Sequence, residues 1–465
     1  MPGSSIGDVY KEAEEAFEIL KVNLYHLKQK ALQAISNHFS ADLLIINPAP
    51  TAREDLVPIS DLMNEEFHVN QNALPTQKSS DFVLIDPGVL PPYSITPIKA
   101  TKSLAESDNQ SMPTTQNAPF ILENKLIRIT INNEGDFISI FDKELDREII
   151  PSGSIANQFQ IFEDRPLTYD AWDIDIFYDD KVDYAQPAEV IRWVEYGKLR
   201  KTLEIKRTIA STTYTQLISV RHNTKQIDFN TTIDWRERYK LLKVAFPVDI
   251  LSPKATYEIQ WGNVERNTHR NTSWDWARFE TCAHKWVDLS EGDYGVSLIN
   301  DCKYGHDIHN NVIRLSLLRG PTIPDPQADL GLHEFRYSLL LHSGNWDERT
   351  QAAAYALNDP AITFRTRNQS KEELSTESLS LISVDKKNVL VETIKKAEDG
   401  NGFILRLYES HRKRGTVEIS SHFPIKAAWE TNLLEENLSP CELAREKIIV
   451  HFNPFEIKTL RVLFK

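Results

Sequence analysis

Three aspartates and one tryptophan stand close together in the stretch Tyr169-Asp-Ala-Trp-Asp-Ile-Asp175. If this stretch is a strand, Asp173 and Asp175 share one face at about 7 Å, because strand side chains alternate between two faces. Two carboxylates at such a spacing can serve as the acid and the base of glycoside hydrolysis. Asp170 and Trp172 would then line the substrate. The structural alternative is a solvated face, or a turn in which the aspartates accept hydrogen bonds from their own backbone.

Arg319 is the best single candidate for a ligand contact, because it stands where an apolar strand runs into a Pro-rich loop. The end of a strand fixes the base of such a loop, which can then line a site. Asp325, Asp329 and His333 follow in the same loop and are candidate substrate contacts. A buried ion pair between Arg319 and one of these two aspartates is the structural alternative.

The longer stretch 257–337 interleaves charged and aromatic side chains without a clean helical or strand period. Aromatic faces beside carboxylates and an arginine suit sugar recognition, because sugars offer C–H faces and hydroxyl groups together. Trp274 and Trp276 flank Asp275 in this stretch. For these two tryptophans, packing in the core is the structural alternative.

The sequence indicates no metal or nucleotide site. His306 and His309 are the closest histidine pair, but the surrounding Asn, Gly and Asp residues suggest a turn. The chain contains no HExxH motif, no His-x-Asp pair, no Gly-x-Ser-x-Gly elbow and no glycine-rich phosphate loop. We therefore expect neither a metal site nor a nucleophile of a recognised kind from these residues.

Composition excludes some partners. A chain of 465 residues has room for about three domains, and 41% hydrophobic residues suffice for real cores. The formal net charge of −14 argues against nucleic acid as a partner, since phosphate binding requires a basic face. No apolar run reaches the length of a membrane span, and the first residues carry no secretory pattern. Cys282, Cys302 and Cys441 are too few for a disulfide framework, so we expect a cytoplasmic location.

Residues 5–38 predict one long helix. Its apolar residues recur at steps of three and four and form one stripe: Ala13, Phe17, Leu20, Leu24 and Leu27. A single helix cannot bury such a stripe by itself, and no other part of the chain has a long helical period. The pattern therefore predicts a helical segment, residues 1–40, that needs a partner.

From residue 41 onward the pattern changes to strands and turns. We expect a small β domain at 41–98, a linker at 99–119, a large β-sandwich at 120–365 and a terminal β-sandwich at 366–465. The turn 133–136, with Gly135 at positive φ, predicts a hairpin. The clearest alternation of apolar and polar residues is Ile227, Phe229, Thr231, Ile233 and Trp235, as in an antiparallel sheet with one solvated face. The predicted fold class is mainly β, with an N-terminal helical segment followed by two or three antiparallel β-sandwich domains.

Several runs carry a specific resemblance: Asp170-Ala-Trp-Asp-Ile-Asp175, Asn271-Thr-Ser-Trp-Asp-Trp-Ala-Arg-Phe-Glu280, Ala283-His-Lys-Trp-Val-Asp-Leu-Ser-Glu291, Leu298-Ile-Asn-Asp-Cys-Lys-Tyr-Gly305, Ser316-Leu-Leu-Arg-Gly-Pro321 and Asn453-Pro-Phe-Glu-Ile-Lys458. They resemble α-mannosidases of glycoside hydrolase family 38, in particular the cytosolic/vacuolar and bacterial branch. The resemblance covers essentially the whole chain, but it is a resemblance to the second half of the family's enzymes only.

The resemblance implies retaining hydrolysis of terminal α-D-mannosyl residues at a zinc-containing site. In the family, a zinc-binding α/β barrel with a His-x-Asp pair and the nucleophile comes first, followed by a three-helix bundle, which the helix at 8–38 resembles in part. The last zinc ligand is a histidine shortly before a Pro-Gly-Ser-Ser-Ile motif, and this chain begins Met1-Pro-Gly-Ser-Ser-Ile6. We therefore expect no zinc ligand, and no zinc bound by this chain alone.

By the same resemblance, Arg319 corresponds to an arginine that the β region contributes to the wall of the active site. Asp325, Asp329 and His333 belong to the same loop, and the stretch 170–175 is a weaker assignment. The expected partners are an α-mannoside or oligosaccharide substrate and a separate N-terminal barrel polypeptide, with a homo-oligomer as a further candidate. The rival function is a non-catalytic carbohydrate-binding or scaffold protein.

Overall fold

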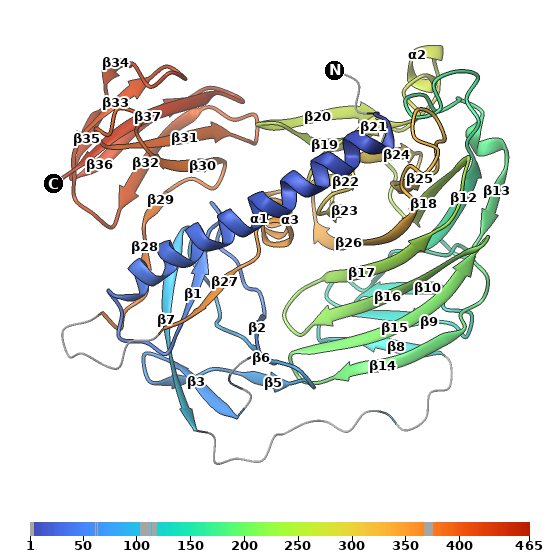
Figure 1. Cartoon of the computed structure of the whole chain (residues 1–465), viewed down its shortest axis with the longest axis horizontal. Coiled ribbons are helices and arrows are strands. Elements are labelled where there is room, and N and C mark those ends of the chain that lie inside the picture. The colour runs from blue at the N-terminus through green and yellow to red at the C-terminus, as the bar shows by residue number, and fades with distance from the viewer. Residues whose placement is uncertain (1–3, 61, 63, 103–112, 114–118, 367–374) are drawn as a thin grey trace. The chain divides into compact units, whose positions relative to one another are not determined.

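The computed structural model describes residues 4–60, 62, 64–102, 113, 119–366 and 375–465. Most of this chain is antiparallel β-sheet, and one long helix, α1 (Gly7–Ser36), stands at its start (Figure 1). The predicted fold class, mainly β with an N-terminal helical segment, is thereby confirmed. The chain forms two compact units: the first comprises the described residues within 1–31, 108–257 and 265–346, and the second those within 32–107, 258–264 and 347–465.

The largest sheet of the first unit has nine strands. In spatial order they are β14 (Val190–Tyr196), β15 (Arg200–Ile209), β16 (Thr212–Arg221), β17 (Gln226–Trp235), β26 (Gly331–Ser343), β23 (Tyr294–Asn300), β22 (Trp286–Ser290), β19 (Lys254–Ile259) and β20 (Gly262–Asn267). The alternation predicted from residue 227 onward falls on β17, where every second side chain from Ile227 to Trp235 is buried. That interpretation is confirmed.

Two further sheets complete the first unit, together with the short helical turns η1 (Tyr178–Asp180) and α2 (Ser273–Trp276). The six-stranded sheet runs in the order β13 (Val182–Tyr184), β12 (Gln158–Glu163), β18 (Lys240–Pro247), β25 (Val312–Arg319), β24 (Gly305–His309) and β21 (Thr281–Cys282). The four-stranded sheet runs in the order β11 (Arg147–Glu148), β10 (Phe137–Asp142), β9 (Ile127–Ile131) and β8 (Phe120–Glu123).

Aromatic side chains join the nine-stranded and six-stranded sheets face to face. Phe159 of β12 stacks on Tyr214 of β16 with ring centroids 4.3 Å apart, and Phe246 of β18 meets Phe229 of β17 at 5.7 Å. All four rings are buried. Offset and edge-to-face ring pairs of this kind stabilise a core beyond the apolar area that they bury. The first unit is thus a β-sandwich, and the strand ends of its six-stranded sheet carry the candidate site.

The predicted hairpin at 133–136 joins β9 and β10. Gly135 has a φ of +83°, in the region that glycine enters without a steric penalty. A Cβ at this position would lie 3.0 Å from Ala188 Cβ and 3.1 Å from Ile205 Cγ2, so space as well as backbone favours glycine. The prediction of a hairpin with Gly135 at positive φ is confirmed.

The second unit contains four sheets and helix α3 (Glu348–Asn358). The first sheet contains β27 (Ile362–Arg365), β1 (Leu43–Asn47), β7 (Ser94–Lys102), β3 (Glu65–Val69) and β4 (Asn72–Ala73), with β28 (Leu379–Ser380) paired to β7; the second contains β2 (Val57–Ile59), β6 (Val83–Ile85) and β5 (Thr76–Lys78). The small β domain expected at 41–98 is therefore completed by two strands from much later in the chain. The expected linker at 99–119 lies largely outside the described residues, while residues 99–102 belong to β7.

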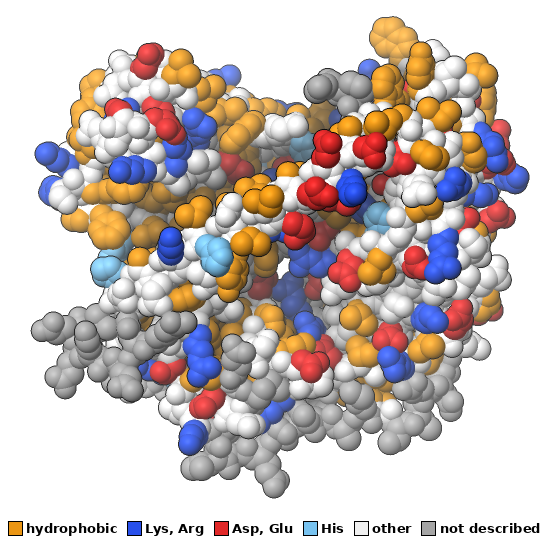
Figure 2. Space-filling model, in the orientation of Figure 1, with side chains coloured by type: hydrophobic (Ala, Val, Ile, Leu, Met, Phe, Trp, Pro, Cys, Tyr) orange, Lys and Arg blue, Asp and Glu red, His pale blue; other side chains and the backbone are white. Residues whose placement is uncertain are grey.

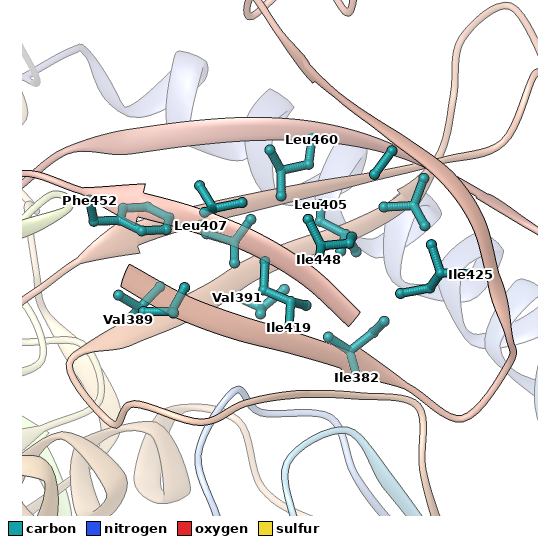
Figure 3. Close-up of a cluster of buried hydrophobic side chains, with 14 residues drawn as sticks. Ile382, Val389, Val391, Leu405, Leu407, Ile419, Ile425, Ile448, Phe452 and Leu460 are labelled. Atoms are coloured by element: carbon teal, nitrogen blue, oxygen red, sulfur yellow. The ribbon is translucent and has the colours of Figure 1, made fainter. Parts of the chain in front are cut away.

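The C-terminal part of the second unit is a sandwich of two sheets. One is β29 (Ile382–Val384), β32 (Gly415–Ser421), β36 (Lys447–Phe452) and β35 (Glu442–Ala444); the other is β30 (Val389–Lys396), β31 (Phe403–Glu409), β37 (Ile457–Phe464), β33 (Ile425–Thr431) and β34 (Asn437–Pro440). Figure 3 shows side chains from both sheets in one cluster between them, among them Leu405 and Leu460 from one sheet and Ile419 and Ile448 from the other. Alternating apolar residues in these strands therefore form one core.

Arg53 fastens the C-terminal end of α3 in the second unit. Its Nη2 donates to the carbonyl of Ala356 at 2.9 Å, its Nη1 donates to the carbonyl of Asp359, and it pairs with Asp55. The last carbonyls of a helix accept no hydrogen bond from within the helix, so they need donors from elsewhere. The helix dipole also favours a cation at this end. A buried guanidinium thus satisfies a helix end that lies about 300 residues away in the chain.

We predict that Arg53→Met lowers the free energy of unfolding by about 2–4 kcal/mol, because it removes a buried cation and the donors of two carbonyls. Urea denaturation followed by circular dichroism measures this loss. The control is Arg349→Met on the same helix, where a half-exposed arginine pairs with Asp347, and a loss below about 1 kcal/mol is expected. Equal losses in the two variants would contradict the role assigned to Arg53.

Helix α1 exposes most of its apolar residues. Its sequence from Asp8 to Ser36 contains neither glycine nor proline, which favours a long helix. Among its side chains only Leu32 and Ser36 are buried, while Phe17, Leu20, Leu24 and Leu27 are each 48–61% exposed. Figure 2 shows hydrophobic side chains along the outer surface of α1. The predicted stripe therefore lies open; no helix in the described residues is long and apolar enough to cross a bilayer.

Candidate functional site

Arg319, the last residue of β25, lies at the centre of the candidate site. Its Nε donates to Asp164 Oδ2 at 2.7 Å, and its Nη2 lies 2.6 Å from the same oxygen. Asp164 directly follows β12, and β18 separates β12 from β25 in the sheet. The sequence predicted an ion pair of Arg319 with Asp325 or Asp329, and that choice of partner is wrong. The partner comes from a strand end 155 residues earlier in the chain.

Arg319 also fastens the loop 169–175. Its Nη2 donates to the carbonyl of Asp170 at 2.8 Å and to the carbonyl of Asp173 at 2.7 Å. Within the loop, the amides of Trp172 and Asp173 both donate to the carbonyl of Tyr169, at 2.8 and 2.9 Å. The guanidinium therefore stabilises a turn in a segment that contains no strand.

Asp170 joins this loop to the segment that follows Arg319. Its Oδ2 accepts hydrogen bonds from the Thr322 amide at 2.7 Å and from Thr322 Oγ1 at 3.1 Å. The Thr322 hydroxyl also contacts Tyr239 Oη at 2.8 Å. The carboxylate of Asp170 thus positions two loops against each other, and Arg319 binds its carbonyl rather than its carboxylate.

Trp172 and Tyr169 form an exposed aromatic pair in the loop. Their rings stack with centroids 5.5 Å apart and an interplanar angle of 20°, and Trp172 is 55% exposed. Tyr169 has a φ of +58°, a left-handed conformation that costs a non-glycine residue on the order of 1 kcal/mol. The indole Nε1 of Trp172 donates to Ser4 Oγ, so the start of the described chain lies against the pair. An exposed, fastened aromatic face suits the C–H face of a sugar.

Asp173 and Asp175 do not lie on a strand. The loop from residue 164 to residue 177 contains no strand, so the premise that placed the two carboxylates on one strand face is wrong. Asp175 Oδ1 accepts a hydrogen bond from the Phe177 amide at 3.0 Å, as in the turn alternative. Asp173 contributes its backbone carbonyl to Arg319. The loop therefore offers hydrogen-bonding groups, without the fixed two-carboxylate arrangement that a strand would give.

Asp325, Asp329 and His333 follow Arg319 in a second loop and the start of β26. Asp325 Oδ1 accepts from the Gln327 amide at 2.9 Å, and His333 Nε2 donates to the Asp329 carbonyl at 2.7 Å. Asp329 has a φ of +60°. A Cβ added at Gly7, the first residue of α1, would lie 3.4 Å from Asp325 Oδ2. The beginning of α1 therefore reaches this loop, just as Ser4 reaches Trp172.

The electrostatics of the site are unusual at Asp164. Burial raises the pKa of this carboxyl above its usual value; Arg319 acts in the opposite direction, and the nearby Asp170 adds to the increase. Asp164 Oδ1 and Asp170 Oδ1 are buried and have no hydrogen-bond partner within the described part of the chain. The guanidinium of Arg319 thus neutralises the carboxylate of Asp164, whereas it binds only the backbone carbonyl of Asp170.

A second charged cluster stabilises the same sheet beneath the loops. Lys243 of β18 is fully buried; its Nζ donates to Glu280 and, at 2.8 Å, to Tyr178 Oη, and lies 3.7 Å from Asp307 Oδ2. Ser316 of β25 donates to the other oxygen of Glu280. Glu280 follows the stretch 271–279, so the cluster ties that stretch to the strand that carries Arg319.

Trp274 and Trp276 are not core residues. They lie on the single turn of α2, where Trp274 is 78% exposed and Trp276 is 39% exposed. Thr272 caps this turn by accepting a hydrogen bond from the Asp275 amide, and Phe177 contacts the Trp276 ring edge-on at 5.9 Å. The core-packing alternative is therefore wrong for both, and the two tryptophans add exposed aromatic surface to the first unit.

His306 and His309 lie on strand β24, so the predicted turn is wrong. His306 is fully buried, and its Nδ1 donates to the Tyr304 carbonyl at 3.1 Å because that oxygen can only accept. Burial lowers the pKa of His306 to about 3. Across the described residues, no group of three or more His, Cys, Asp and Glu side chains is arranged to hold a metal ion.

Sequence reasoning missed Asp164 and Thr322. Asp164 directly follows an apolar strand, the same position relative to a strand that drew attention to Arg319, and this signal could have placed it on the candidate list. Thr322 carries no comparable signal, because its role depends on the fold of two loops. The arrangement as a whole can bind hydroxyl groups through Arg319 and the surrounding oxygens, with Trp172 as an adjacent aromatic face.

Comparison with known proteins identifies similar families. The model of the "Glycosyl hydrolases family 38 C-terminal domain" matches residues 122–327, and that of the "Glycosyl hydrolases family 38 C-terminal beta sandwich domain" matches residues 388–460. The two matches together span more than half of the chain. They fall on the sandwich of the first unit and on the C-terminal sandwich of the second.

Curated relatives and a solved structure agree with these matches. Alpha-mannosidase 2C1 of Mus musculus is 36% identical over 352 residues, which cover 74% of this chain and 34% of the relative. The alpha-mannosidase of Saccharomyces cerevisiae is 30% identical over 382 residues, with 74% and 35% covered. The chain thus spans about a third of the length of these relatives. The crystal structure of an alpha-mannosidase from Enterococcus faecalis V583 has the same fold, with a TM-score of 0.82 at 16% identity, covering 99% of this chain and 61% of that one.

Proposed function

The chain belongs to glycoside hydrolase family 38, and from this membership we propose that it works as the C-terminal, β-rich part of an α-mannosidase that hydrolyses terminal α-D-mannosyl residues. The proposal assigns a share of the substrate wall to the loops around Arg319. It assigns the catalytic chemistry to a barrel that this chain does not contain. The chain alone is therefore proposed to be inactive.

The main observation that supports the proposal is the fixed position of the Arg319 guanidinium. It is held between two strand ends and a loop that exposes Trp172, so that a donor and an aromatic face are presented together. Ser4 contacts Trp172, and Gly7 approaches Asp325. By the family resemblance, the motif to which Ser4 belongs follows the last zinc ligand closely. The contacts of Ser4 and Gly7 thus support a position of these loops near the metal of the complete enzyme.

The remaining candidates stay proposed members of this wall. They are Asp170, Asp173, Asp175, Asp325, Asp329 and His333. Of the side-chain oxygens among them, Asp170 Oδ2, Asp175 Oδ1 and Asp325 Oδ1 bind within the protein, so contact with a sugar hydroxyl is proposed chiefly for Asp173 and for the imidazole of His333.

The residues of this chain do not fit a zinc site. The sequence contains no His-x-Asp pair, His306 Nδ1 donates to a carbonyl, and no group of three or more His, Cys, Asp and Glu side chains in the described structure is arranged to hold a metal ion. We therefore assign no step of the reaction to a metal held here. Zinc, which the resemblance implies for the complete enzyme, would be held by the barrel.

Helix α1 supports docking of such a barrel. Its stripe of Phe17, Leu20, Leu24 and Leu27 is about half exposed or more over the length of the helix. Large contiguous apolar surfaces on a protein mark sites of association. The curated relatives carry about two thirds of their length outside the matched region, which supplies a partner of the required size.

We predict that the chain mixed with a zinc-binding barrel polypeptide of the family hydrolyses 4-nitrophenyl α-D-mannoside, whereas either polypeptide alone does not. The measured quantity is 4-nitrophenol release with added zinc and after chelation. Restored activity that chelation abolishes is the expected result, because the barrel holds the metal and this chain completes the wall.

A matched control separates docking from folding. Leu20→Glu with Leu24→Glu places charges in the exposed stripe of α1, at side chains that are 48% and 53% exposed. This variant should keep its circular dichroism spectrum and lose the restored activity. A mixture that binds, shown by co-migration in size-exclusion chromatography, but stays inactive would refute the proposed function.

A second candidate function is carbohydrate binding without catalysis. The exposed Tyr169–Trp172 pair and the exposed Trp274 favour it, since aromatic faces held in solvent bind sugars through stacking. Calorimetric titration of the chain alone with mannose and mannobiose tests this function. Absence of measurable heat at high protein concentration would count against it.

We propose a reducing compartment, the cytoplasm, as the location. Cys282, Cys302 and Cys441 are free thiols. Burial raises the pKa of Cys302 and of Cys441 to about 11, so both stay protonated and unreactive at neutral pH. None of the three is arranged for a structural disulfide.

A further inference from the structure

We propose that Asp164 is a positioning residue of the substrate wall: it orients Arg319 so that Arg319 fastens the loop 169–175 and presents Trp172 and its own Nη1 to a sugar. The loop-fastening part concerns this chain alone, while the sugar part rests on the proposed function. Asp164 itself would not touch the ligand, because it is only 3% exposed.

The sheet register explains why Asp164 meets Arg319. Glu163 of β12 pairs with Lys240 of β18, and Leu241 of β18 pairs with Arg319 of β25. Asp164 and Arg319 therefore flank the start of β18 from its two sides, about 10 Å apart along the hydrogen-bonding direction. The long arginine side chain bridges this distance. The Asp164 amide donates to the Tyr239 carbonyl at 2.8 Å, which fixes the carboxylate on its strand end.

The donors of Arg319 are divided between two tasks. Nε and Nη2 bind Asp164 Oδ2, and Nη2 also binds the carbonyls of Asp170 and Asp173. In the part of the chain that the structure describes, Nη1 has no protein partner, and it is not among the buried atoms that lack one. Arginine has five donors in a rigid fork, so fixing two nitrogens fixes the direction of the third. Nη1 is the donor left for a ligand.

The loop 169–175 depends on this guanidinium. It contains no strand, and one of its residues, Tyr169, is held in a left-handed conformation. A segment with few regular hydrogen bonds opens more readily than the sheet beneath it. The two carbonyl contacts from Nη2 therefore decide whether Trp172 stands in one orientation. Without Asp164, Arg319 would have no fixed anion and would turn toward the carboxylates in solvent.

Burial of the pair favours a positioning role over a purely stabilising one. Burial of an ion pair costs desolvation energy that its attraction repays only with excellent geometry, so such pairs add little net stability while they specify one arrangement. Here burial raises the pKa of Asp164 despite the contact with Arg319, and Asp164 Oδ1 has no described partner. The pair therefore serves to orient Arg319, although its burial costs desolvation energy.

The chain offers a matched pair as a control. Arg207 Nη1 donates to the buried Asp136 at 2.7 Å, and its Nε and Nη2 donate to the carbonyls of Gln186 at 2.8 Å and Ala185 at 3.2 Å. This pair has the same design, one carboxylate and two loop carbonyls, in the same unit. Its loop, 185–186, is not the loop of Trp172.

The test is hydrogen–deuterium exchange of the full chain, followed by mass spectrometry. In Asp164→Asn, peptides covering 168–177 should exchange roughly tenfold faster or more, because hydrogen bonds to charged groups are lost or weakened. Peptides from β15 to β17 should exchange no faster than they do in Asp136→Asn, and the melting temperature should fall by a similar amount in the two variants, because each loses one partner of a buried ion pair. Asp136→Asn should accelerate the peptide around 185–186 and leave 168–177 unchanged. Arg319→Lys, which keeps the charge and loses the fork, should reproduce the effect of Asp164→Asn.

Titration with methyl α-D-mannoside gives the second readout. Asp164→Asn should weaken the affinity about 3- to 10-fold, and Asp136→Asn should leave it unchanged. Unchanged exchange of 168–177 in both Asp164→Asn and Arg319→Lys would overturn the proposal. So would exchange throughout the sandwich that is faster than in Asp136→Asn, which is the mark of a merely structural residue, or weaker binding without any change of the loop. Faster loop exchange in a chain whose wild type binds no mannoside would support the positioning of the loop by Asp164 and refute the sugar assignment of the proposed function.

Discussion

Replacing Lys243 with methionine is expected to lower the free energy of unfolding by about 3–5 kcal/mol, the range for removing one partner of a buried ion pair. Lys243 is fully buried, and methionine fills much of its space without the charge. The variant would leave Glu280 without its cation and Asp307 with Arg314 alone. Uncompensated buried carboxylates are costly because the protein interior solvates them poorly.

The titration of this cluster supports the size of the effect. Burial alone would lower the pKa of Lys243, but the carboxylates of Glu280 and Asp307 outweigh it and raise the pKa. Burial would likewise raise the pKa of Asp307, but Lys243 and Arg314 lower it. Each charge is thus stabilised by its partners more than burial penalises it, so removing the lysine affects the whole cluster.

Urea denaturation followed by circular dichroism measures the loss. Lys181→Met is the matched control, since Lys181 pairs with Glu163 near the same sheet but is largely exposed, and little change is expected. Equal stabilities of Lys243→Met and the wild type would refute the importance of the cluster. Exchange near 271–280 should also rise in Lys243→Met, because Glu280 connects that stretch to β18 and β25.

The second large effect is a dependence of the free energy of unfolding on pH, which arises from the protonation of His306. Its pKa is lowered to about 3 by burial, and Lys243, Arg266 and His284 add to this shift; the hydrogen bond to the Tyr304 carbonyl acts in the opposite direction. Above pH 6.5 the imidazole is neutral in both states, and its stabilising contribution is complete. As pH falls below 6.5, the unfolded chain binds a proton and the native chain does not, so stability is lost down to about pH 3.

The expected loss between pH 6.5 and pH 4.5 is about 2–3 kcal/mol, from about 1.4 kcal/mol for each pH unit. His306→Gln keeps a donor for the Tyr304 carbonyl and cannot take up the proton, so its unfolding free energy should fall less over the same interval. The measurement is urea denaturation at several pH values. His451→Gln serves as control, because that ring is exposed in the folded chain and its loss should leave the slope unchanged. A wild-type slope in His306→Gln would contradict the assignment.

Both effects arise in the sheet that carries Arg319, and this links stability to the proposed function. Lys243 and His306 lie on β18 and β24, the two neighbours of β25. Their buried, charged or titratable side chains hold the strands in one register. Arg319 and Asp164 use this register to meet across β18. Loss of the cluster is therefore expected to disturb the substrate wall before it unfolds the terminal sandwich.

The sequence by itself determined the fold class and the family. Alternation of period two in 227–235 identifies a strand with one buried face, because the pleat sends successive side chains to opposite sides. The stripe of α1 identifies a helix, because residues at steps of three and four share one face. Such patterns are local, so they can be recognised without knowing what the element packs against. The runs of residues that resemble family 38 are local in the same way.

Only the tertiary structure decided the partners and the exposure of the charged and aromatic residues. Arg319 pairs with Asp164 rather than with the nearer Asp325 or Asp329, because β18 is inserted between β12 and β25 and the register aligns the two strand ends. Trp274 is exposed although packing in the core was the structural alternative for it, because it lies on a single capped turn rather than on a strand of the sheet. A side chain's partner depends on strand order and register, which the spacing of residues along the chain does not contain. For this reason Arg319 could be proposed as a site residue from the sequence, while its ion-pair partner Asp164 could not.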